Sequence, residues 1–135
     1  MMYLLDTNIL SELIKKRPNP NFLARLGSEK SKTLFTSSIC VFELRLGSAL
    51  RDDFPIFWQR IMAELLSAIS ILHFGEDEAT IAGDILAQLQ KTGQKIGIED
   101  IFIAATALAN RCTLVTANIK HYSRIPGLSI ENWIN

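Results

Sequence analysis

Four polar residues, spread over the whole chain, share one predicted location just past the carboxyl end of a β-strand: Asp6, Glu43, Asp100 and Asn118. In an open parallel sheet those strand ends meet at one edge, where the ligand crevice of α/β proteins lies. The four side chains are therefore expected to converge on one crevice. Carboxylates a few ångströms apart repel one another by roughly 4 kcal/mol per close pair at an effective dielectric of 20. Such a cluster either keeps protons or holds a cation.

The donor atoms of this predicted cluster are all oxygens, which favours Mg²⁺, with Mn²⁺ as a substitute, over zinc. The histidines, His73 and His121, are too few and too far apart in the sequence to suggest a zinc site. A metal ion held by carboxylates and waters can activate a water molecule and offset the charge of a phosphodiester under attack. The predicted chemistry is therefore metal-dependent hydrolysis.

Each of these residues also has an ordinary structural interpretation. Asp6 could only cap the helix that follows it, because Asp is a good capping residue. Asp100, next to Glu99, could be a first-turn acid favoured by the helix dipole. Glu43 could be a buried acid that pairs with a structural arginine, and Asn118 could simply form a turn. The equivalent location of all four at strand ends favours a common site.

The elements that must position these side chains follow from hydrophobic periodicity. Short apolar runs predict strands over residues 2–5, 33–36, 69–74, 113–116 and 128–130. Helical spacing predicts helices after Asp6, over 20–27, from Ser37 or Ser38 to about residue 50, after Pro55, over 76–92 and over 99–111. Because strands alternate with helices, we predict an α/β fold: a single three-layer α/β/α domain over residues 1–135 with a central, mostly parallel sheet.

Composition sets limits on the partners and on the compartment. The chain has 135 residues, 48% of them hydrophobic, and a formal net charge of zero, which argues against a broad cationic surface. No apolar stretch approaches the roughly 20 residues that span a bilayer, and the N-terminus has no basic region typical of a signal peptide. Cys40 and Cys112 lie in separate apolar stretches and are predicted to be reduced, buried thiols. We therefore expect a cytoplasmic protein without a membrane partner.

Several short motifs follow one another over essentially the whole chain: Leu5-Asp6-Thr7-Asn8, Ser37-Ser38 to Glu43 with Gly47, Gly97-Ile98-Glu99-Asp100 with Ile103-Ala104-Ala105, Val115-Thr116-Ala117-Asn118, and Pro126-Gly127-Leu128 to Trp133. In this order and spacing they resemble the motifs of PIN-domain ribonucleases, specifically the VapC-type toxins of type II toxin–antitoxin pairs. The resemblance implies an endoribonuclease that hydrolyses RNA phosphodiester bonds with Mg²⁺.

The resemblance also implies roles for individual residues. Asp6, Glu43 and Asp100 would form the catalytic, metal-binding acidic site. A fourth acidic position in many relatives matches Asn118, so a second metal ion would here have one fewer anionic ligand. Supporting residues that hydrogen-bond the carboxylates or a metal-bound water would be Thr7, Asn8, Thr116 and Asn118, and Glu99 could add a carboxylate. With Asn118 in an acidic position, the alternative is a catalytically silent PIN-like module that binds RNA or a protein.

The expected partners are RNA, a cognate antitoxin that covers the acidic crevice, and a second copy of the chain in a homodimer. The candidates for phosphate contacts are Lys15, Lys16, Arg17, Lys95, Lys120 and Arg124. The candidates for an apolar dimer or antitoxin groove, which could equally be core, are Leu46, Leu50, Phe54, Phe57 and Trp58.

Overall fold

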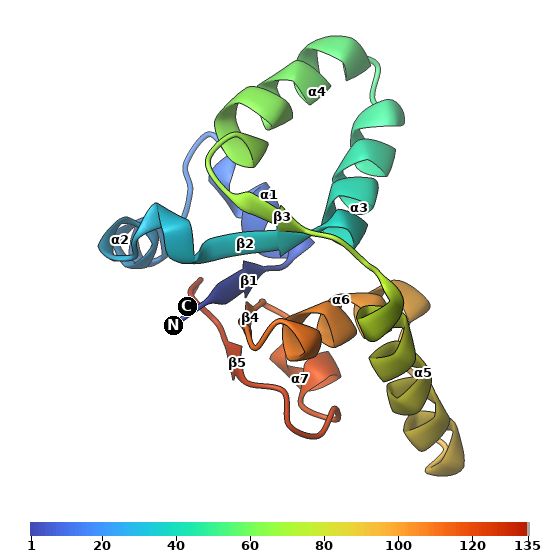
Figure 1. The fold of residues 1–135 in the computed structure, drawn as a ribbon. Helices are drawn as coiled ribbons and strands as arrows, with labels where there is room; N and C mark the ends of the chain where they lie inside the picture. The colour runs from blue at the N-terminus through green and yellow to red at the C-terminus, as the bar shows by residue number, and fades with distance from the viewer. Residues whose placement is uncertain (135) are drawn as a thin grey trace.

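The computed structural model describes residues 1–134, which form one parallel sheet covered by helices (Figure 1). Its strands lie in the order β3-β2-β1-β4-β5, and each neighbouring pair is parallel. The strands are β1 (Tyr3–Leu5), β2 (Leu34–Ser37), β3 (Ser70–Leu72), β4 (Thr113–Val115) and β5 (Ile130–Glu131). The predicted α/β class with a central parallel sheet is therefore confirmed.

Helices connect the strands and form the outer layers of the α/β/α arrangement. They are α1 (Thr7–Leu13), α2 (Pro20–Ser28), α3 (Ser38–Ala49), α4 (Phe54–Ile61), α5 (Glu76–Lys91), α6 (Ile98–Ala109) and α7 (Ile119–Tyr122). A 3₁₀ turn (Ser31–Thr33) precedes β2, and a π-helical segment (Met62–Leu66) follows α4. Two of these helices, α5 and α6, pack against each other.

Strand β1 is the centre of the fold because it pairs with β2 on one side and β4 on the other. All three of its residues are buried, as expected for a strand covered on both faces. The neighbouring strands end at the same edge, and the N–H of Asp6 donates to the carbonyl of Val115 (2.9 Å) where the β1–β4 ladder ends. The first residues after β1, β2 and β4 are thereby brought to one side of the sheet.

The structure corrects several predicted boundaries. The helix predicted after Pro55 begins one residue before it, because proline fits the first turn of a helix, and it becomes π-helical at Met62. Strand β2 begins one residue later than predicted, since Thr33 ends the 3₁₀ turn. Strand β5 is shifted to Ile130–Glu131, where Ile130 pairs with Leu114. Helix α7 was not predicted, because four residues are too few to show periodicity.

Two predictions from composition can be compared with the structure. Cys40 and Cys112 are both free thiols and buried, as predicted. Within residues 1–134, none of the helices combines the length and the apolar character needed to cross a bilayer.

Candidate active site

Asp6 lies where strand β1 ends and helix α1 begins. Its backbone is extended (φ −70°, ψ 162°), and its Oδ1 accepts a hydrogen bond from the N–H of Thr7 (2.8 Å), so it does cap α1. Its Oδ2 accepts a second bond from Oγ1 of Thr116 (2.8 Å), which follows β4. With only 4% of its surface exposed, Asp6 is a buried carboxylate as well as a cap.

The surroundings of Asp6 make its ionised form unfavourable. Burial raises the pKa of Asp6 from 3.8 to about 6, against the opposing effect of the hydrogen bonds from Thr116 and Thr7. The negative charges of Asp100 and Glu43 raise this pKa further. A bound cation would stabilise the ionised form, because an opposite charge within a few ångströms favours a carboxylate.

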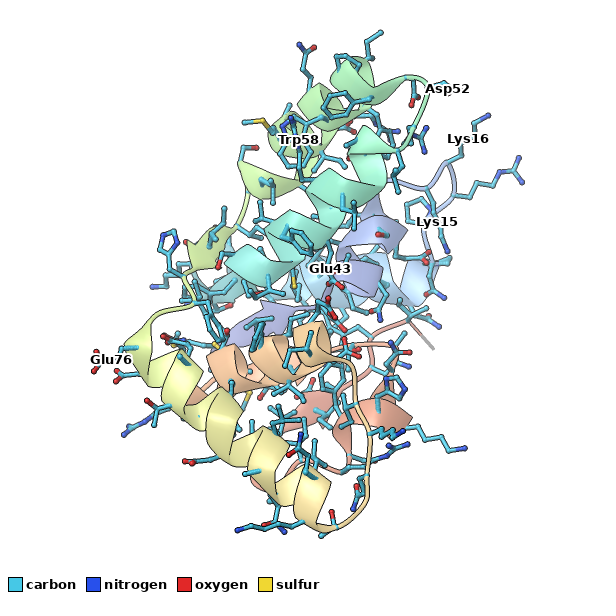
Figure 2. All side chains as sticks on the ribbon, turned by 90° about the vertical axis from the view of Figure 1, so that its right-hand side faces the viewer. Lys15, Lys16, Glu43, Asp52, Trp58 and Glu76 are labelled. Carbon is cyan, nitrogen blue, oxygen red and sulfur yellow. The ribbon has the colours of Figure 1, made fainter. Side chains whose placement is uncertain are left out.

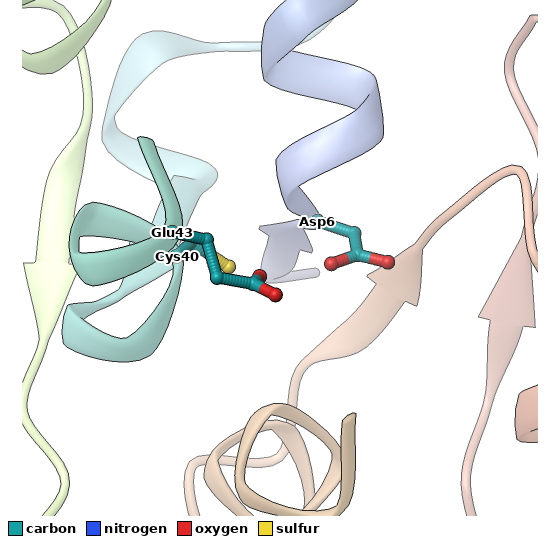
Figure 3. A group of neighbouring side chains, drawn as sticks. All are labelled: Asp6, Cys40 and Glu43. Atoms are coloured by element: carbon teal, nitrogen blue, oxygen red, sulfur yellow. The ribbon is translucent and has the colours of Figure 1, made fainter. Parts of the chain in front are cut away.

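Glu43 extends from α3 toward Asp6. Helix α3 starts beside β2 because Oγ of Ser37 caps it by accepting a bond from the N–H of Cys40 (3.1 Å). Oε1 of Glu43 accepts a short bond from Oγ1 of Thr7 (2.6 Å). One potential ligand atom each from Asp6, Cys40 and Glu43 lies within 4.8 Å of the others (Figure 3). Within the described part of the chain no lysine or arginine forms an ion pair with Glu43, so the expected alternative of a structural arginine partner is wrong.

Cys40 was predicted to be buried but not to lie at the acidic cluster. It stands three residues before Glu43, which places it one turn earlier on the same face of α3. Burial raises the pKa of its thiol, and the charge of Asp6 acts in the same direction. The thiol therefore stays protonated, and the two carboxylates supply the charged donors. This donor set fits Mg²⁺ or Mn²⁺, which prefer carboxylate oxygens and water.

Asp100 stands in the first turn of α6, which follows helix α5, so its predicted place just past the end of a strand is wrong. Its side chain contacts helix α7. Its Oδ1 accepts a hydrogen bond from the hydroxyl of Tyr122 (3.1 Å), and its Oδ2 lies 3.3 Å from Nδ1 of His121. Its charge acts on Asp6, but it is outside the tight group formed by Asp6, Cys40 and Glu43. The structure thus brings Asp6 and Glu43 together most closely and places Asp100 beside them.

Sequence reasoning missed Tyr122, because it left α7 unpredicted. Its side chain is fully buried, and burial raises the pKa of its phenol, so the hydroxyl keeps its proton and donates to Asp100. The side chain of His121 is half exposed. The sequence around His121 and Tyr122 shows no helical periodicity, because α7 has only four residues. These two residues approach Asp100 through the fold of the chain after β4.

The predicted supporting residues differ in what they contact. Thr7 and Thr116 hydrogen-bond Glu43 and Asp6, as described above. The amide nitrogen of Asn8 lies 3.5 Å from Oδ2 of Asp6, while its oxygen accepts from the N–H of Ala117 (3.2 Å). Asn8 therefore connects α1 to the segment after β4.

The remaining two predicted residues lie at the margin of the cluster. Asn118 is exposed, and its N–H donates to Oγ1 of Thr116 (3.0 Å), so its backbone orients the threonine that holds Asp6. Glu99 is half-buried, one residue before Asp100. A Cβ on Gly97 would lie 3.8 Å from Oε2 of Glu99 and 4.0 Å from Oδ2 of Asp100, so both carboxylates border the same loop.

A groove of about 340 Å³ opens directly beside the acidic cluster. Thr7 and Glu43 are among its lining residues, and the others are Ser11, Ile14, Leu44, Gly47, Ser48, Arg51, Phe57 and Ile61. Its mixed lining provides apolar surface next to the carboxylates.

The five residues that were considered for a dimer or antitoxin groove differ in their exposure to solvent. Leu46 (50% exposed) and Leu50 (78% exposed) project from α3. Phe54, Phe57 and Trp58 are half-buried in α4, where guanidinium groups cover their rings: Arg45 lies over Phe54 and Trp58, and Arg51 lies over Phe57. Phe42, which was not among the five, is 53% exposed and extends the apolar stripe of α3.

Comparison with known proteins agrees with this architecture. The sequence matches the PIN domain family over residues 3–128. It is 37% identical to Ribonuclease VapC2 of Haemophilus influenzae over 99% of both chains, and 30% identical to the tRNA(fMet)-specific endonuclease VapC of Shigella flexneri over 98% of both. Among solved structures, it is similar to a chain of VapBC2 of Rickettsia felis bound to a promoter DNA fragment, with a TM-score of 0.87 and 35% identity over 98% of this chain and 99% of that chain. It is also similar to a chain of FitAcB of Neisseria gonorrhoeae, with a TM-score of 0.88 and 32% identity over 97% of both chains. The chain therefore belongs to the PIN domain family and groups there with the VapC-type ribonucleases.

Proposed function

We propose that this protein is a Mg²⁺-dependent endoribonuclease that hydrolyses RNA phosphodiester bonds and acts as the toxin of a toxin–antitoxin pair. The observation that carries the proposal is the close approach of the Asp6 and Glu43 carboxylates, with Asp100 beside them. Two such groups without a cationic partner are unfavourable unless a proton or a metal ion joins them. The names of the relatives, which are ribonucleases and endonucleases, support RNA as the substrate.

The carboxylates and threonines of the site would have different roles in this reaction. Asp6, Glu43 and Asp100 would hold the ion. When bound, Mg²⁺ lowers the pKa of a coordinated water and offsets the negative charge that develops on the phosphodiester. Thr7 and Thr116 orient the carboxylates through bonds of 2.6 and 2.8 Å to Glu43 and Asp6. Glu43, which is more exposed than Asp6, also suits the orientation of the attacking water.

Basic side chains near Glu43 are candidates for contacts with the RNA phosphates. Figure 2 shows Lys15 and Lys16 projecting beside the face that carries Glu43. All three residues of the Lys15-Lys16-Arg17 run are exposed, but Lys15 forms an ion pair with Glu12 at 2.8 Å, so Lys16 and Arg17 are the better candidates for phosphate contacts. A homodimer remains a proposal, for which the exposed stripe of Phe42, Leu46 and Leu50 on α3 is a candidate surface.

An antitoxin partner is supported by the solved relatives, which include the VapBC2 and FitAcB complexes. The groove that begins at Glu43 would allow a bound antitoxin segment to block the carboxylates. Co-expression with the protein encoded by a neighbouring short reading frame should yield a stable complex that lacks RNA cleavage. Cleavage by that complex at the rate of the free chain would contradict the proposal.

The direct test is cleavage of purified cellular RNA with mapped cut sites. The parent protein should cut in Mg²⁺ or Mn²⁺ and stop when a chelator is added. Asp6→Asn and Asp100→Asn should lose cleavage, while Asp84→Asn, on the exposed face of α5, should cut like the parent. Asp6→Asn and Asp100→Asn variants that cut at the parental rate would refute the assignment of these residues, whereas a parent protein that does not cleave RNA in Mg²⁺ or Mn²⁺ would favour the silent PIN-like module.

A further inference from the structure

Both carboxylate oxygens of Asp100 contact side chains of α7. The Tyr122 hydroxyl lies 3.1 Å from Oδ1, and Nδ1 of His121 lies 3.3 Å from Oδ2. The contacts span about twenty residues of sequence and connect the first turn of α6 to the turn after β4. Asp6 and Glu43, in contrast, are held by threonines, Thr7 and Thr116.

The two partners of Asp100 differ in rigidity. Tyr122 is fully buried, so its ring has one position and its hydroxyl is a fixed point against which Asp100 is oriented. The Asp100 side chain is 25% exposed and, without this bond, could rotate toward solvent. Each carboxylate oxygen has two lone pairs, so one hydrogen bond per oxygen still leaves an acceptor for a cation.

The orientation of Asp100 matters because it is the most distant of the three carboxylates. Asp6 and Glu43 already meet within 4.8 Å, whereas Asp100 lies outside that group. A bound ion gains the third carboxylate only if Asp100 is held facing the other two. Partners of this kind, behind a metal ligand, typically change metal affinity or activity by about 10–100-fold when they are removed.

We propose that Tyr122 is the positioning residue of Asp100, which it holds toward Asp6 and Glu43, with His121 supporting the second oxygen. The proposal rests on the proposed metal-dependent function and adds residues to its site. Tyr122 does not touch the ion or the RNA. It acts only through the carboxylate.

The test is the affinity of the purified protein for Mg²⁺ alone, measured from the rise of the melting temperature with Mg²⁺ concentration and repeated for Mn²⁺. Tyr122→Phe removes the hydroxyl and keeps the buried ring, so the fold should persist. We expect its Mg²⁺ affinity to fall about tenfold, with a matching rise in the Mg²⁺ concentration needed for half-maximal cleavage. Tyr3→Phe is the matched control, because Tyr3 is also buried and its hydroxyl contacts Arg25 rather than the acidic site.

A double-mutant cycle separates positioning from general loss of stability. With Asp100→Asn already present, Tyr122→Phe should change Mg²⁺ affinity no further, because the residue it positions is gone. If Tyr122→Phe does not fold, the exposed His121→Ala serves instead: its Mg²⁺ affinity should fall toward the lower end of the roughly 10–100-fold range, and parental affinity would overturn the positioning of Asp100 by α7.

The outcomes distinguish this proposal from the function it rests on. A parent protein without Mg²⁺-dependent stabilisation or cleavage overturns both. Weakened Mg²⁺ binding in Asp100→Asn together with parental affinity in Tyr122→Phe overturns the positioning role alone. The positioning role is also overturned if the loss of Mg²⁺ affinity in the double variant equals the sum of the losses in free energy of the two single variants.

Discussion

Replacing Asp6 by asparagine should stabilise the metal-free protein and at the same time remove its stabilisation by Mg²⁺. The carboxylate is 4% exposed, and its pKa is raised to about 6 from 3.8. Because the folded state binds the proton more tightly than the unfolded state does, ionisation of Asp6 destabilises the fold. The stability of the parent therefore falls as the pH rises through roughly 4 to 6.

The size of this effect follows from the difference in pKa between the folded and unfolded states. Each pKa unit corresponds to about 1.4 kcal/mol, so the charged carboxylate destabilises the fold at pH 7 by about 3 kcal/mol at most. Asparagine keeps one oxygen to cap α1 but loses an acceptor for Thr116, which costs about 1 kcal/mol. The expected net gain is about 1–2 kcal/mol, or about 3–8 °C in melting temperature for a domain of this size.

The assay is thermal unfolding of the parent, Asp6→Asn and Asp84→Asn in a chelating buffer, at several pH values between 4 and 8. The difference between Asp6→Asn and the parent should be small near pH 4 and reach its full size above pH 7. Asp84→Asn should follow the parent throughout, because Asp84 is exposed. Mg²⁺ at 100 times its dissociation constant should then stabilise the parent by about 2.7 kcal/mol, which raises its melting temperature, and should leave the melting temperature of Asp6→Asn unchanged.

Two results would refute this reasoning. An Asp6→Asn protein no more stable than the parent above pH 7 without metal would show that the buried charge is not unfavourable. A gain of the same size at pH 4 and pH 8 would show that it does not come from ionisation.

Two further predictions test the scaffold that holds the site. Thr7→Val should lower cleavage, because Glu43 loses its 2.6 Å bond, whereas Thr7→Ser should restore most of it; equal cleavage rates for the two variants would exclude a role for the hydroxyl. Leu4→Ala, in the middle of β1 with no exposed surface, should lower the free energy of unfolding in urea by about 2–5 kcal/mol; a loss below about 1 kcal/mol would contradict the central place of this strand.

The sequence alone was sufficient to predict the class of the fold and the approach of Glu43 to Asp6, but not the position of Asp100, which begins a helix that follows another helix and not a strand. Alternating short apolar runs and amphipathic helices specify a parallel α/β sheet, and a parallel sheet places the ends of its strands at one edge. An acid after β1 and another in the first turns of α3 must then approach each other, whatever the details of packing. Local chemistry also indicated where α3 begins, since Ser37, one of the two serines predicted to start it, accepts the capping bond from the N–H of Cys40.

Only the tertiary structure decided which groups surround those acids. Cys40 reaches the site because the face of α3 that carries Glu43 turns toward β1, and Tyr122 and His121 reach Asp100 because the chain after β4 folds back over the start of α6. Such contacts join residues far apart in the sequence through a short helix and a turn, which have no periodicity to detect. The raised pKa of Asp6 could not be predicted from the sequence either. It depends mainly on the burial of this carboxylate, which is a property of the packed molecule.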